Sequence, residues 1–444
     1  MCCHFRFFKL PTLMMSVITG VFVLELALPP LAAQIEFDRA PIHYSTSEVN
    51  DHIYKLQRRM DAGEIKLRFD EKHGYLKSLL EALDITPSSQ MLVFSKTSLQ
   101  LRRISPNTPR ALYFNDHSYI GWVPNGEVIE VSSVDPLQGA IFYTLRQEET
   151  NSPKFVRDRG NCLSCHASSR TQGVPGLFVR SVYPSPSGQP HFGSGTFRTN
   201  HASPLKQRWG GWYVTGTHGR QRHMGNVVSK ERDRPEILDV EAGANVTDLS
   251  EYTRIDRYLT THSDVVALMV LEHQAEMHNL ITHANFETRV ASHHGAIMNR
   301  ALDRPIDFVS ESTKRRITRV SERLLNYMLF AEEIQLTDKI EGTSDFAENF
   351  SALGIKDSQG RSLRDFDLQT RIFKHPCSYL IYSDAFSSLP LQVKDRTYRR
   401  LWEILTGRDQ SDTFAHLSTA DRRAIFEILH DTHSDLPKYW KADR

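Results

Sequence analysis

Cysteine is scarce in this sequence, and its scarcity excludes several classes of protein. Only five of the 444 residues are cysteines, and two of them, Cys2 and Cys3, lie ahead of an apolar N-terminal run. The three that remain argue against a fold held by a disulfide framework. Among these three, Cys162 and Cys165 are closely spaced, and no second such pair is left to complete a four-ligand structural zinc site. Cys377 has no partner left over, so we expect it to be a buried free thiol.

The sequence also lacks an excess of charge, repeats and low-complexity tracts. Its formal net charge is +1, and it has no basic run or stripe of alternating basic and aromatic residues. Nucleic acid is therefore not an expected partner. The apolar and aromatic fractions are ordinary, and the chain is long enough to bury a large core in two or three subdomains.

The longest apolar run lies at the N-terminus. Arg6 and Lys9 precede the run at residues 10–24, and small residues follow at 31–33. A positive flank, an apolar core of this length and small residues are typical of a secretory signal peptide. We therefore expect residues 1–33 to be removed and the protein to be periplasmic or secreted. The run is short for a membrane span, so no stable span is expected after cleavage, with an uncleaved anchor as the alternative.

The most informative segment is residues 162–166, which read Cys-Leu-Ser-Cys-His. Cys-x-x-Cys-His is the attachment signature of c-type haem. Thiols at this spacing, Cys162 and Cys165, reach the two vinyl groups of one porphyrin, and His166 then falls beneath the ring as the proximal axial ligand of the iron. The pattern predicts one covalently attached haem c. A redox-active or disulfide pair and a zinc site are the alternatives, but no βαβ pattern surrounds the motif as in thioredoxin-like sites.

Over residues 162–166 the chain resembles c-type cytochromes, and this resemblance covers only the motif. Small class I cytochromes c are helical and carry the motif after a short N-terminal helix, whereas here it lies between β-rich segments. More widely, residues 90–300 resemble large secreted monohaem proteins of bacteria. That wider resemblance implies a haem cofactor and no particular substrate.

The hydrophobic pattern predicts an α+β fold, with a β-rich half that carries the motif followed by an all-helical half. Short β-rich runs recur over residues 91–145 and are separated by turns. The expected parts are a signal peptide (1–33), an N-terminal helical segment (34–86), a β-rich haem-binding domain (87–249) and a helical domain (250–444). Helices are expected at 262–290, 312–333, 364–385, 394–407 and 418–432.

The ligand at the sixth position of the iron distinguishes an electron carrier from an open catalytic or sensing site. The segment 217–226 follows an expected strand and carries three possible ligands: His218, His223 and Met224. Met224 is taken as the distal ligand, with the two histidines as alternatives. A basic surface loop with hydrogen-bonded histidines is a further alternative.

A second group of polar residues follows the apolar stretch 265–271 on the same expected helix. His273 and Glu276 stand three positions apart in it. Polar groups on a buried helix need partners. We consider His273 and Glu276 as candidate acid–base groups near the haem, with a hydrogen-bonded core cluster or a second metal site as alternatives.

Arginine side chains near the motif are candidates for binding the haem propionates, because arginine binds carboxylates bidentately. Surface ion pairs are the alternative for all four: Arg157, Arg159, Arg180 and Arg198. Taken together, these features predict an exported monohaem c-type cytochrome that transfers electrons through the iron. A haem enzyme of peroxidase or oxidase type, or a gas sensor, is the alternative, and the redox partner or substrate is not predicted.

Overall fold

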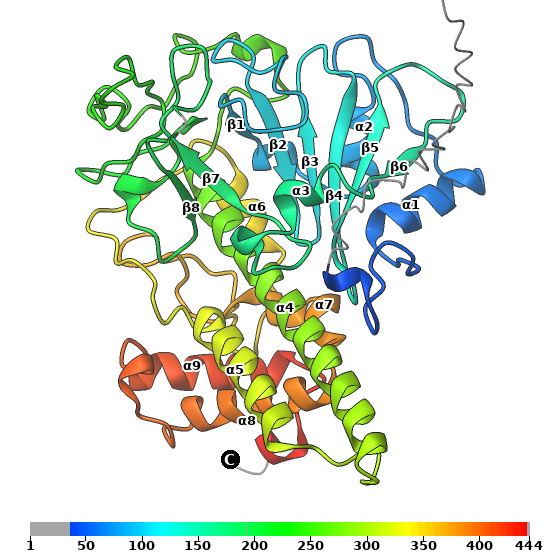
Figure 1. The fold of residues 1–444 in the computed structure, drawn as a ribbon. Coiled ribbons are helices and arrows are strands. Elements are labelled where there is room, and N and C mark those ends of the chain that lie inside the picture. Colours follow the sequence, from blue (N-terminus) through cyan, green and yellow to red (C-terminus); the bar gives the residue numbers. More distant parts are fainter. Residues whose placement is uncertain (1–35, 192, 442–444) are drawn as a thin grey trace, which may run out of the picture. The chain divides into compact units, whose positions relative to one another are not determined.

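The computed structural model describes residues 36–191 and 193–441, and from Phe37 onward the chain forms one compact unit. The predicted signal peptide lies outside the described residues. The fold is α+β, as the sequence predicts, with a β-rich N-terminal half and a helical C-terminal half (Figure 1). The boundary expected at residue 250 falls inside the compact unit. None of the helices in the described part of the chain has the length and apolarity needed to cross a bilayer.

The strands are β1 (Met91–Val93), β2 (Arg110–Phe114), β3 (Ser118–Trp122), β4 (Val128–Asp135), β5 (Gly139–Arg146), β6 (Phe155–Arg157), β7 (Val179–Val182), β8 (Thr196–Thr199) and β9 (Trp212–Tyr213). The α-helices are α1 (His52–Asp61), α2 (Leu76–Ala82), α3 (Leu163–His166), α4 (Val265–Ala301), α5 (Glu311–Met328), α6 (Phe346–Ala352), α7 (Asp384–Ser387), α8 (Leu391–Leu405) and α9 (Thr419–Thr432). The five β-rich runs expected between residues 91 and 145 all form strands.

Seven of the strands form one antiparallel sheet in the order β6-β5-β4-β3-β2-β1-β9. Strands β1 to β6 are neighbours in chain order, and each pairs with the next in antiparallel fashion. At the β3–β4 turn, Asn125 adopts a φ of 58°, a left-handed conformation that asparagine tolerates. Strand β9 comes from beyond the Cys-x-x-Cys-His motif and pairs with β1, so the motif is carried on a connection that leaves the sheet at one edge and returns at the other.

The long helix α4 links the two halves of the fold (Figure 1). Asp264 caps its N-terminus, because its carboxylate accepts hydrogen bonds from the backbone N–H groups of Val266 and Ala267 at 2.8 and 3.1 Å. Every residue from Val265 to Thr282 is buried, which is expected of a helix covered by protein on all sides. Beyond Thr282 the helix packs against α5 and continues to Ala301, further than the sequence suggests.

The prediction of a continuous helix at 364–385 is wrong. Asp367 accepts hydrogen bonds from the backbone N–H groups of Gln369, Thr370 and Arg371, and such local bonds compete with a helix. Leu368 has a φ of 55°, which no α-helix contains. The segment instead forms a turn followed by short helical pieces that include α7. Within it Cys377 is fully buried and free, as expected.

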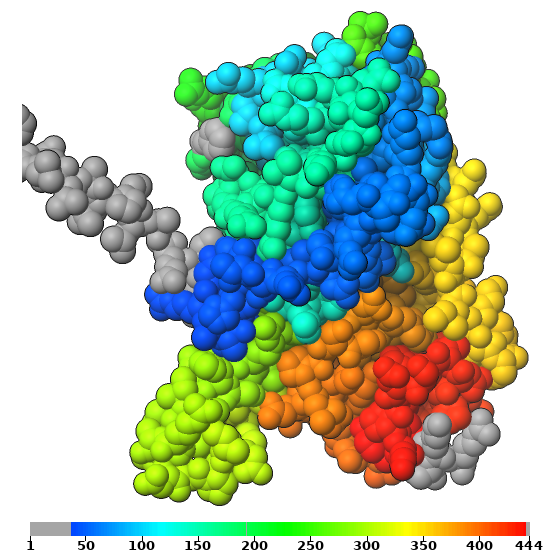
Figure 2. Space-filling model, turned by 90° about the vertical axis from the view of Figure 1, so that its right-hand side faces the viewer, coloured from blue at the N-terminus to red at the C-terminus, as the bar shows by residue number. Residues whose placement is uncertain are grey.

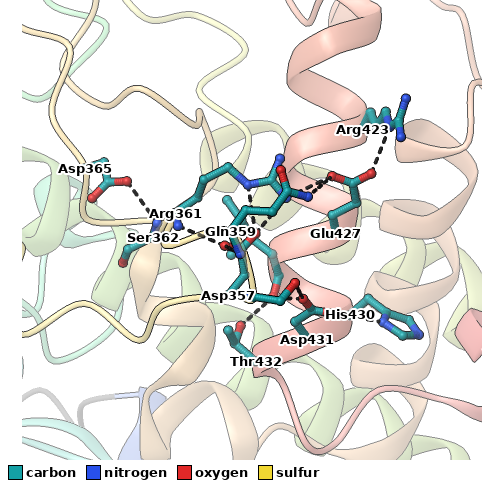
Figure 3. Close-up of polar contacts among 12 residues, drawn as sticks. Asp357, Gln359, Arg361, Ser362, Asp365, Arg423, Glu427, His430, Asp431 and Thr432 are labelled. Atoms are coloured by element: carbon teal, nitrogen blue, oxygen red, sulfur yellow. Dashed lines mark hydrogen bonds and ion pairs between the residues drawn. The ribbon is translucent and has the colours of Figure 1, made fainter.

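A polar network fixes the loop between α6 and this turn onto α9 (Figure 3). Asp357 accepts hydrogen bonds from the backbone N–H groups of Gln359 and Arg361 at 2.9 and 2.8 Å. The Arg361 guanidinium bridges Asp357 and Glu427 of α9, at 2.6 and 2.8 Å. Asp431, one turn further along α9, accepts a hydrogen bond from the Ser358 hydroxyl at 2.6 Å. The loop is therefore positioned by side chains that lie far away in the sequence.

Candidate cofactor site

The Cys-x-x-Cys-His motif forms α3, a single helical turn between β6 and β7. Asp158 accepts hydrogen bonds from the backbone N–H groups of Gly160 and Cys162 at 3.1 and 2.9 Å, which fixes the start of the turn. Residues three apart in a helix share a face, so Cys162 and Cys165 point the same way. Both thiols are free, and Cys165 is exposed. Burial and the nearby Asp158 carboxylate raise the pKa of the Cys162 thiol to about 12, the opposite of the shift that activates a redox cysteine pair.

A cavity of about 440 Å³ lies beside this turn, and Cys162, Cys165 and His166 all line it. Its volume is within the range of sites for small molecules and cofactors. Most of the other lining side chains are apolar or aromatic, and they include Leu99, Leu101, Leu112, Phe114, Phe142, Phe178, Val179, Trp212, Leu271 and Ala275.

One face of the large sheet forms a wall of the cavity, and the strand register explains which residues reach it. Paired residues of an antiparallel sheet lie on the same face. Met91 pairs with Leu112, Leu112 with Gly121, Gly121 with Glu130, and Glu130 with Thr144. All five line the cavity. Gly121 lies in the middle of this row, where the missing side chain leaves a flat region on the sheet.

His166 is oriented by a hydrogen bond and by two aromatic rings. Its Nδ1 lies 2.9 Å from the backbone carbonyl of Gly176. Because a carbonyl can only accept, Nδ1 carries the proton, and Nε2 is left as a lone-pair donor that makes no hydrogen bond to a described residue. The ring centroids of Phe142 and Phe178 lie 4.9 and 5.3 Å from the imidazole. Burial lowers the pKa of His166, which keeps the ring neutral, as a metal ligand must be.

Helix α4 holds the segment that orients His166. The side chain of Asn279 accepts a hydrogen bond from the backbone N–H of Leu177 at 2.9 Å and donates one to the Leu177 carbonyl at 2.6 Å. The backbone of Gly176 passes so close that an added Cβ would lie 2.1 Å from the Asn279 Oδ1. Position 176 therefore needs glycine, and Asn279 of α4 holds the neighbouring backbone so that the Gly176 carbonyl bonds His166.

The cavity also contains charged groups. Arg110 and Glu130 form an ion pair of 2.6 Å on the sheet face, with both side chains more than four-fifths buried. Lys96, Arg170 and Arg180 line the cavity as well, and none of the three forms an ion pair with a described carboxylate. The site thus offers three uncompensated cations to a ligand that carries negative charge.

Of the four arginines suggested for carboxylate binding, only Arg180 lines the cavity. Arg157 donates to the backbone carbonyls of Tyr44 and Ser47 at 2.7 and 3.2 Å. Arg198 pairs with Glu276 at 3.2 Å. Arg159 is exposed and lies outside the lining.

The three suggested distal ligands lie in a different place. His218 uses both ring nitrogens, with Nδ1 2.7 Å from the Gln221 carbonyl and Nε2 accepting from the backbone N–H of Asn245 at 3.0 Å. His223 accepts from the backbone N–H of Gly225 at 3.0 Å. The Met224 sulfur accepts from the Ser181 hydroxyl at 3.7 Å. None of these three side chains lines the cavity beside Cys162.

The two suggested acid–base residues are also bonded within the protein. His273 Nδ1 lies 2.9 Å from His201 Nδ1, and its Nε2 lies 2.8 Å from the Ser378 hydroxyl. Glu276 pairs with Arg198 and accepts a hydrogen bond from the Gln172 amide at 2.5 Å. Helix α4 presents Leu271 and Ala275 to the cavity instead. These contacts are those of a hydrogen-bonded core cluster, and they tie α4 to the loop that follows the motif.

Sequence reasoning missed the residues on the sheet face, above all Met91, Arg110 and Glu130. A signal for them was present: side chains alternate along a strand, and the polar and small residues 110, 121 and 130 interrupt otherwise apolar strands. The described residues contain no cluster of three or more His, Cys, Asp or Glu side chains that could hold a metal ion by themselves. Comparison with family models, with curated proteins and with solved structures found no match to this chain.

Proposed function

We propose that this protein is an exported c-type haem protein, in which Cys162 and Cys165 hold one haem c covalently and His166 binds its iron as the proximal ligand. One observation carries the proposal: the three side chains of the motif line the same apolar cavity, which is large enough for a cofactor. A chance match to the motif would have no reason to lie beside such a cavity.

Further features of the cavity support a porphyrin as the occupant. His166 has Nε2 available and Nδ1 bonded to a backbone carbonyl, which is the usual arrangement of a metal-binding histidine. The row through Gly121 gives a planar group a flat, largely apolar surface. Lys96, Arg170 and Arg180 suit the two propionate carboxylates.

We infer electron transfer as the function. A bound haem c supplies one-electron chemistry between ferrous and ferric iron. The residues of the chain set the conditions for that chemistry. The apolar wall limits water, the Gly176 carbonyl makes the His166 imidazole a stronger ligand, and the Arg110–Glu130 pair places fixed charges in the cavity.

A haem enzyme or gas sensor with an open distal position is the second candidate, and one observation favours it. Among the lining residues His166 is the only histidine and Met91 the only methionine, so the cavity offers few strong ligands for a sixth position. The buried Arg110–Glu130 pair is also able to donate and accept hydrogen bonds to a small molecule bound in the cavity.

The first experiment asks whether the cofactor is covalent and where it is attached. The protein is matured in a host that makes c-type cytochromes, denatured, and extracted with acidic organic solvent. We expect the haem to stay with the chain, and Cys162→Ser with Cys165→Ser to abolish covalent attachment. Cys377→Ser is the matched control, because this buried thiol lies outside the cavity, and it should retain the haem. A colourless wild-type chain would overturn the proposal.

The second experiment separates the carrier from the open site. The visible spectrum of the reduced protein is recorded with and without carbon monoxide. An unchanged low-spin spectrum means two strong axial ligands and supports electron transfer. A large change supports the enzyme or sensor. Met91→Ala and Met224→Ala are then compared to test which methionine, if either, is the sixth ligand of the iron. Of the two, only Met91 lines the cavity.

A further inference from the structure

The connection between α4 and α5 carries the largest group of exposed apolar side chains in the described part of the chain. Five side chains there are 46–57 % exposed, out of 14 large apolar side chains that are exposed in that part: Ile297, Met298, Leu302, Ile306 and Phe308. All five fall within residues 297–308, which we call the hairpin tip. Single exposed apolar residues are normal on a protein surface, but a contiguous group of them marks an interaction site.

Hydrogen bonds to the end of α4 build the hairpin tip. The buried side chain of Asn299 donates to the backbone carbonyls of Ile306 and Phe308 at 3.3 and 2.8 Å. The Asn299 carbonyl accepts from the backbone N–H of Arg304 at 2.9 Å. Ser310 then caps the start of α5. The polar backbone of the loop is thus bonded inside the tip, and the apolar side chains remain at its surface.

The hairpin tip projects from the rest of the protein. In Figure 1 the joined ends of α4 and α5 extend beyond α8 and α9, and in Figure 2 the same segment, in light green, projects at one side of the orange and red segments. Sites for small molecules are concave. A projecting apolar surface instead suits a partner that deforms around it, as the headgroup region of a bilayer does.

The area of the tip is small for a contact with a second copy of the chain. Five side chains that are about half exposed offer on the order of 400 Å² together. A standard protein–protein interface uses about 800 Å² on each partner. Attachment to a bilayer has no such requirement, because its strength scales with whatever apolar area enters the membrane.

The charges around the tip indicate the kind of bilayer. Within the tip, two arginines balance two aspartates. Residues 311–323 of α5 follow with five basic and two acidic side chains, a formal net charge of +3, whereas residues 34–444 as a whole have 52 of each. Lys314 pairs with one of the two acidic residues, Glu311, at 2.8 Å, and Arg400 of α8 pairs with the other, Glu322, at 2.9 Å. The basic surface next to the tip complements anionic lipid headgroups.

The N-terminal end of the described chain lies on the same helix. The rings of Phe37 and Phe286 are 6.2 Å apart, and Arg289 donates to the Pro41 carbonyl at 3.1 Å. Figure 2 shows this N-terminal segment, in dark blue, beside the light-green hairpin.

This position brings the tip within reach of the membrane that the chain is expected to cross. The apolar run at 10–24 is joined to Phe37 by residues 25–36 alone, which span at most about 40 Å. Along α4 the tip begins about 16 Å beyond Phe286, since each residue rises 1.5 Å. The placement rests on the proposed export, but not on the proposed haem.

We propose that the hairpin tip attaches the exported protein to the surface of a bilayer that contains anionic lipid. The apolar side chains enter the boundary between headgroups and acyl chains, and the basic residues of α5 contact the lipid phosphates. Ala275, which lines the cofactor cavity, lies about 33 Å along α4 from Ile297. The attached protein therefore keeps this cavity away from the membrane surface, where a soluble partner can approach it.

The test is flotation of the mature full-length protein with lipid vesicles. One set of vesicles contains phosphatidylcholine and phosphatidylglycerol in equal parts, and the other contains phosphatidylcholine alone. We expect the bound fraction to be at least about threefold larger with the anionic vesicles, and high salt to reduce this difference. Absence of binding to the anionic vesicles, or equal binding to both sets, would overturn the proposal. Haem content does not enter the measurement, so failure of the haem proposal leaves its result unchanged.

Variants locate the attachment. Ile306→Ser combined with Phe308→Ser removes two of the five apolar side chains and should lower the partition coefficient at least about tenfold. Leu353→Ser combined with Ile355→Ser is the matched control, because these side chains are 69 and 51 % exposed but lie outside the tip, and it should bind as the wild type does. Equal binding of the two double variants contradicts the assignment, and circular dichroism checks that each is folded.

Charge and self-association are tested separately. Arg315→Glu combined with Arg319→Glu should reduce binding to the anionic vesicles to the level seen with phosphatidylcholine alone, since both side chains are exposed on α5. Unchanged binding would contradict the role given to α5. Sedimentation without vesicles should show a monomer. A dimer that dissociates in the Ile306→Ser, Phe308→Ser variant would mean that a second copy covers the tip, and would overturn the proposal.

Discussion

Asn279 is the residue whose removal most directly tests how the cofactor site is built. Its side chain is fully buried and makes both hydrogen bonds to the backbone of Leu177, the residue next to the carbonyl that orients His166. In Asn279→Ala the N–H and the C=O of Leu177 both lose their partner inside the protein. Each buried group left unpaired costs about 1–3 kcal/mol, so the free energy of unfolding should fall by about 2–6 kcal/mol.

Urea unfolding followed by circular dichroism measures this loss. Asn349→Ala is the matched control, because Asn349 is exposed on α6 and its side chain makes one hydrogen bond, to the Ser88 hydroxyl at 3.2 Å. The control should change the free energy of unfolding by less than about 0.5 kcal/mol. Hydrogen exchange gives a local readout, since the Leu177 amide should exchange faster in Asn279→Ala. A loss no larger than that of the control, or an unchanged exchange rate at Leu177, would refute the reasoning.

Two further predictions follow from the same contacts. Gly121→Leu places a side chain in the middle of the cavity wall and should lower the haem content of the purified protein. Gly121→Ala should not lower it, because the added Cβ would meet only ordinary contacts of 3.4–3.5 Å. Equal haem contents in the two variants would contradict the position proposed for the cofactor. Burial lowers the pKa of His273 and of His223 to about 3, far below the ordinary value of 6.5. Between these pH values the two imidazoles bind protons in the unfolded chain but not in the folded one, so their contribution to the free energy of unfolding should decrease as the pH falls from about 6.5 to 4. In His273→Gln the decrease in the free energy of unfolding should be smaller by about 1.4 kcal/mol per pH unit. In the control His294→Gln, at an exposed position, the decrease should be unchanged. If the free energy of unfolding of His273→Gln depended on pH as steeply as that of the wild type, His273 would not be a buried neutral imidazole.

Local sequence patterns predicted the secondary structure where it depends on interactions between residues that are close in the sequence. Runs of β-branched and aromatic residues separated by turn residues gave all five strands between 91 and 145, and the capping box at Ser418 marks the start of α9. The helix expected at 364–385 failed because Asp367 forms hydrogen bonds with the three following N–H groups, a local alternative that apolar spacing does not reveal.

The interpretation of single polar residues from the sequence was much less secure. His218, His223 and Met224 were considered because they follow a strand and include iron-binding atoms, yet sequence distance from His166 does not say which surface the segment packs on. Its contacts are made with the backbone around Asn245 and with Ser181 of β7. His273 and Glu276 are bonded to His201 and Arg198, which come from a separate part of the chain.

The sequence alone determined the spacing of Cys162, Cys165 and His166, because one helical turn fixes how three nearby side chains lie relative to each other. It also determined the alternation that gives each strand two faces. Only the tertiary structure decided which residues line the cavity beside the motif. These are the paired sheet residues from Met91 to Thr144 and the three cations, and the hydrogen bonds between Asn279 and Leu177 position the loop next to them. The physical reason is that a cavity is formed between surfaces far apart in the chain, and its shape depends on how they pack rather than on any one segment.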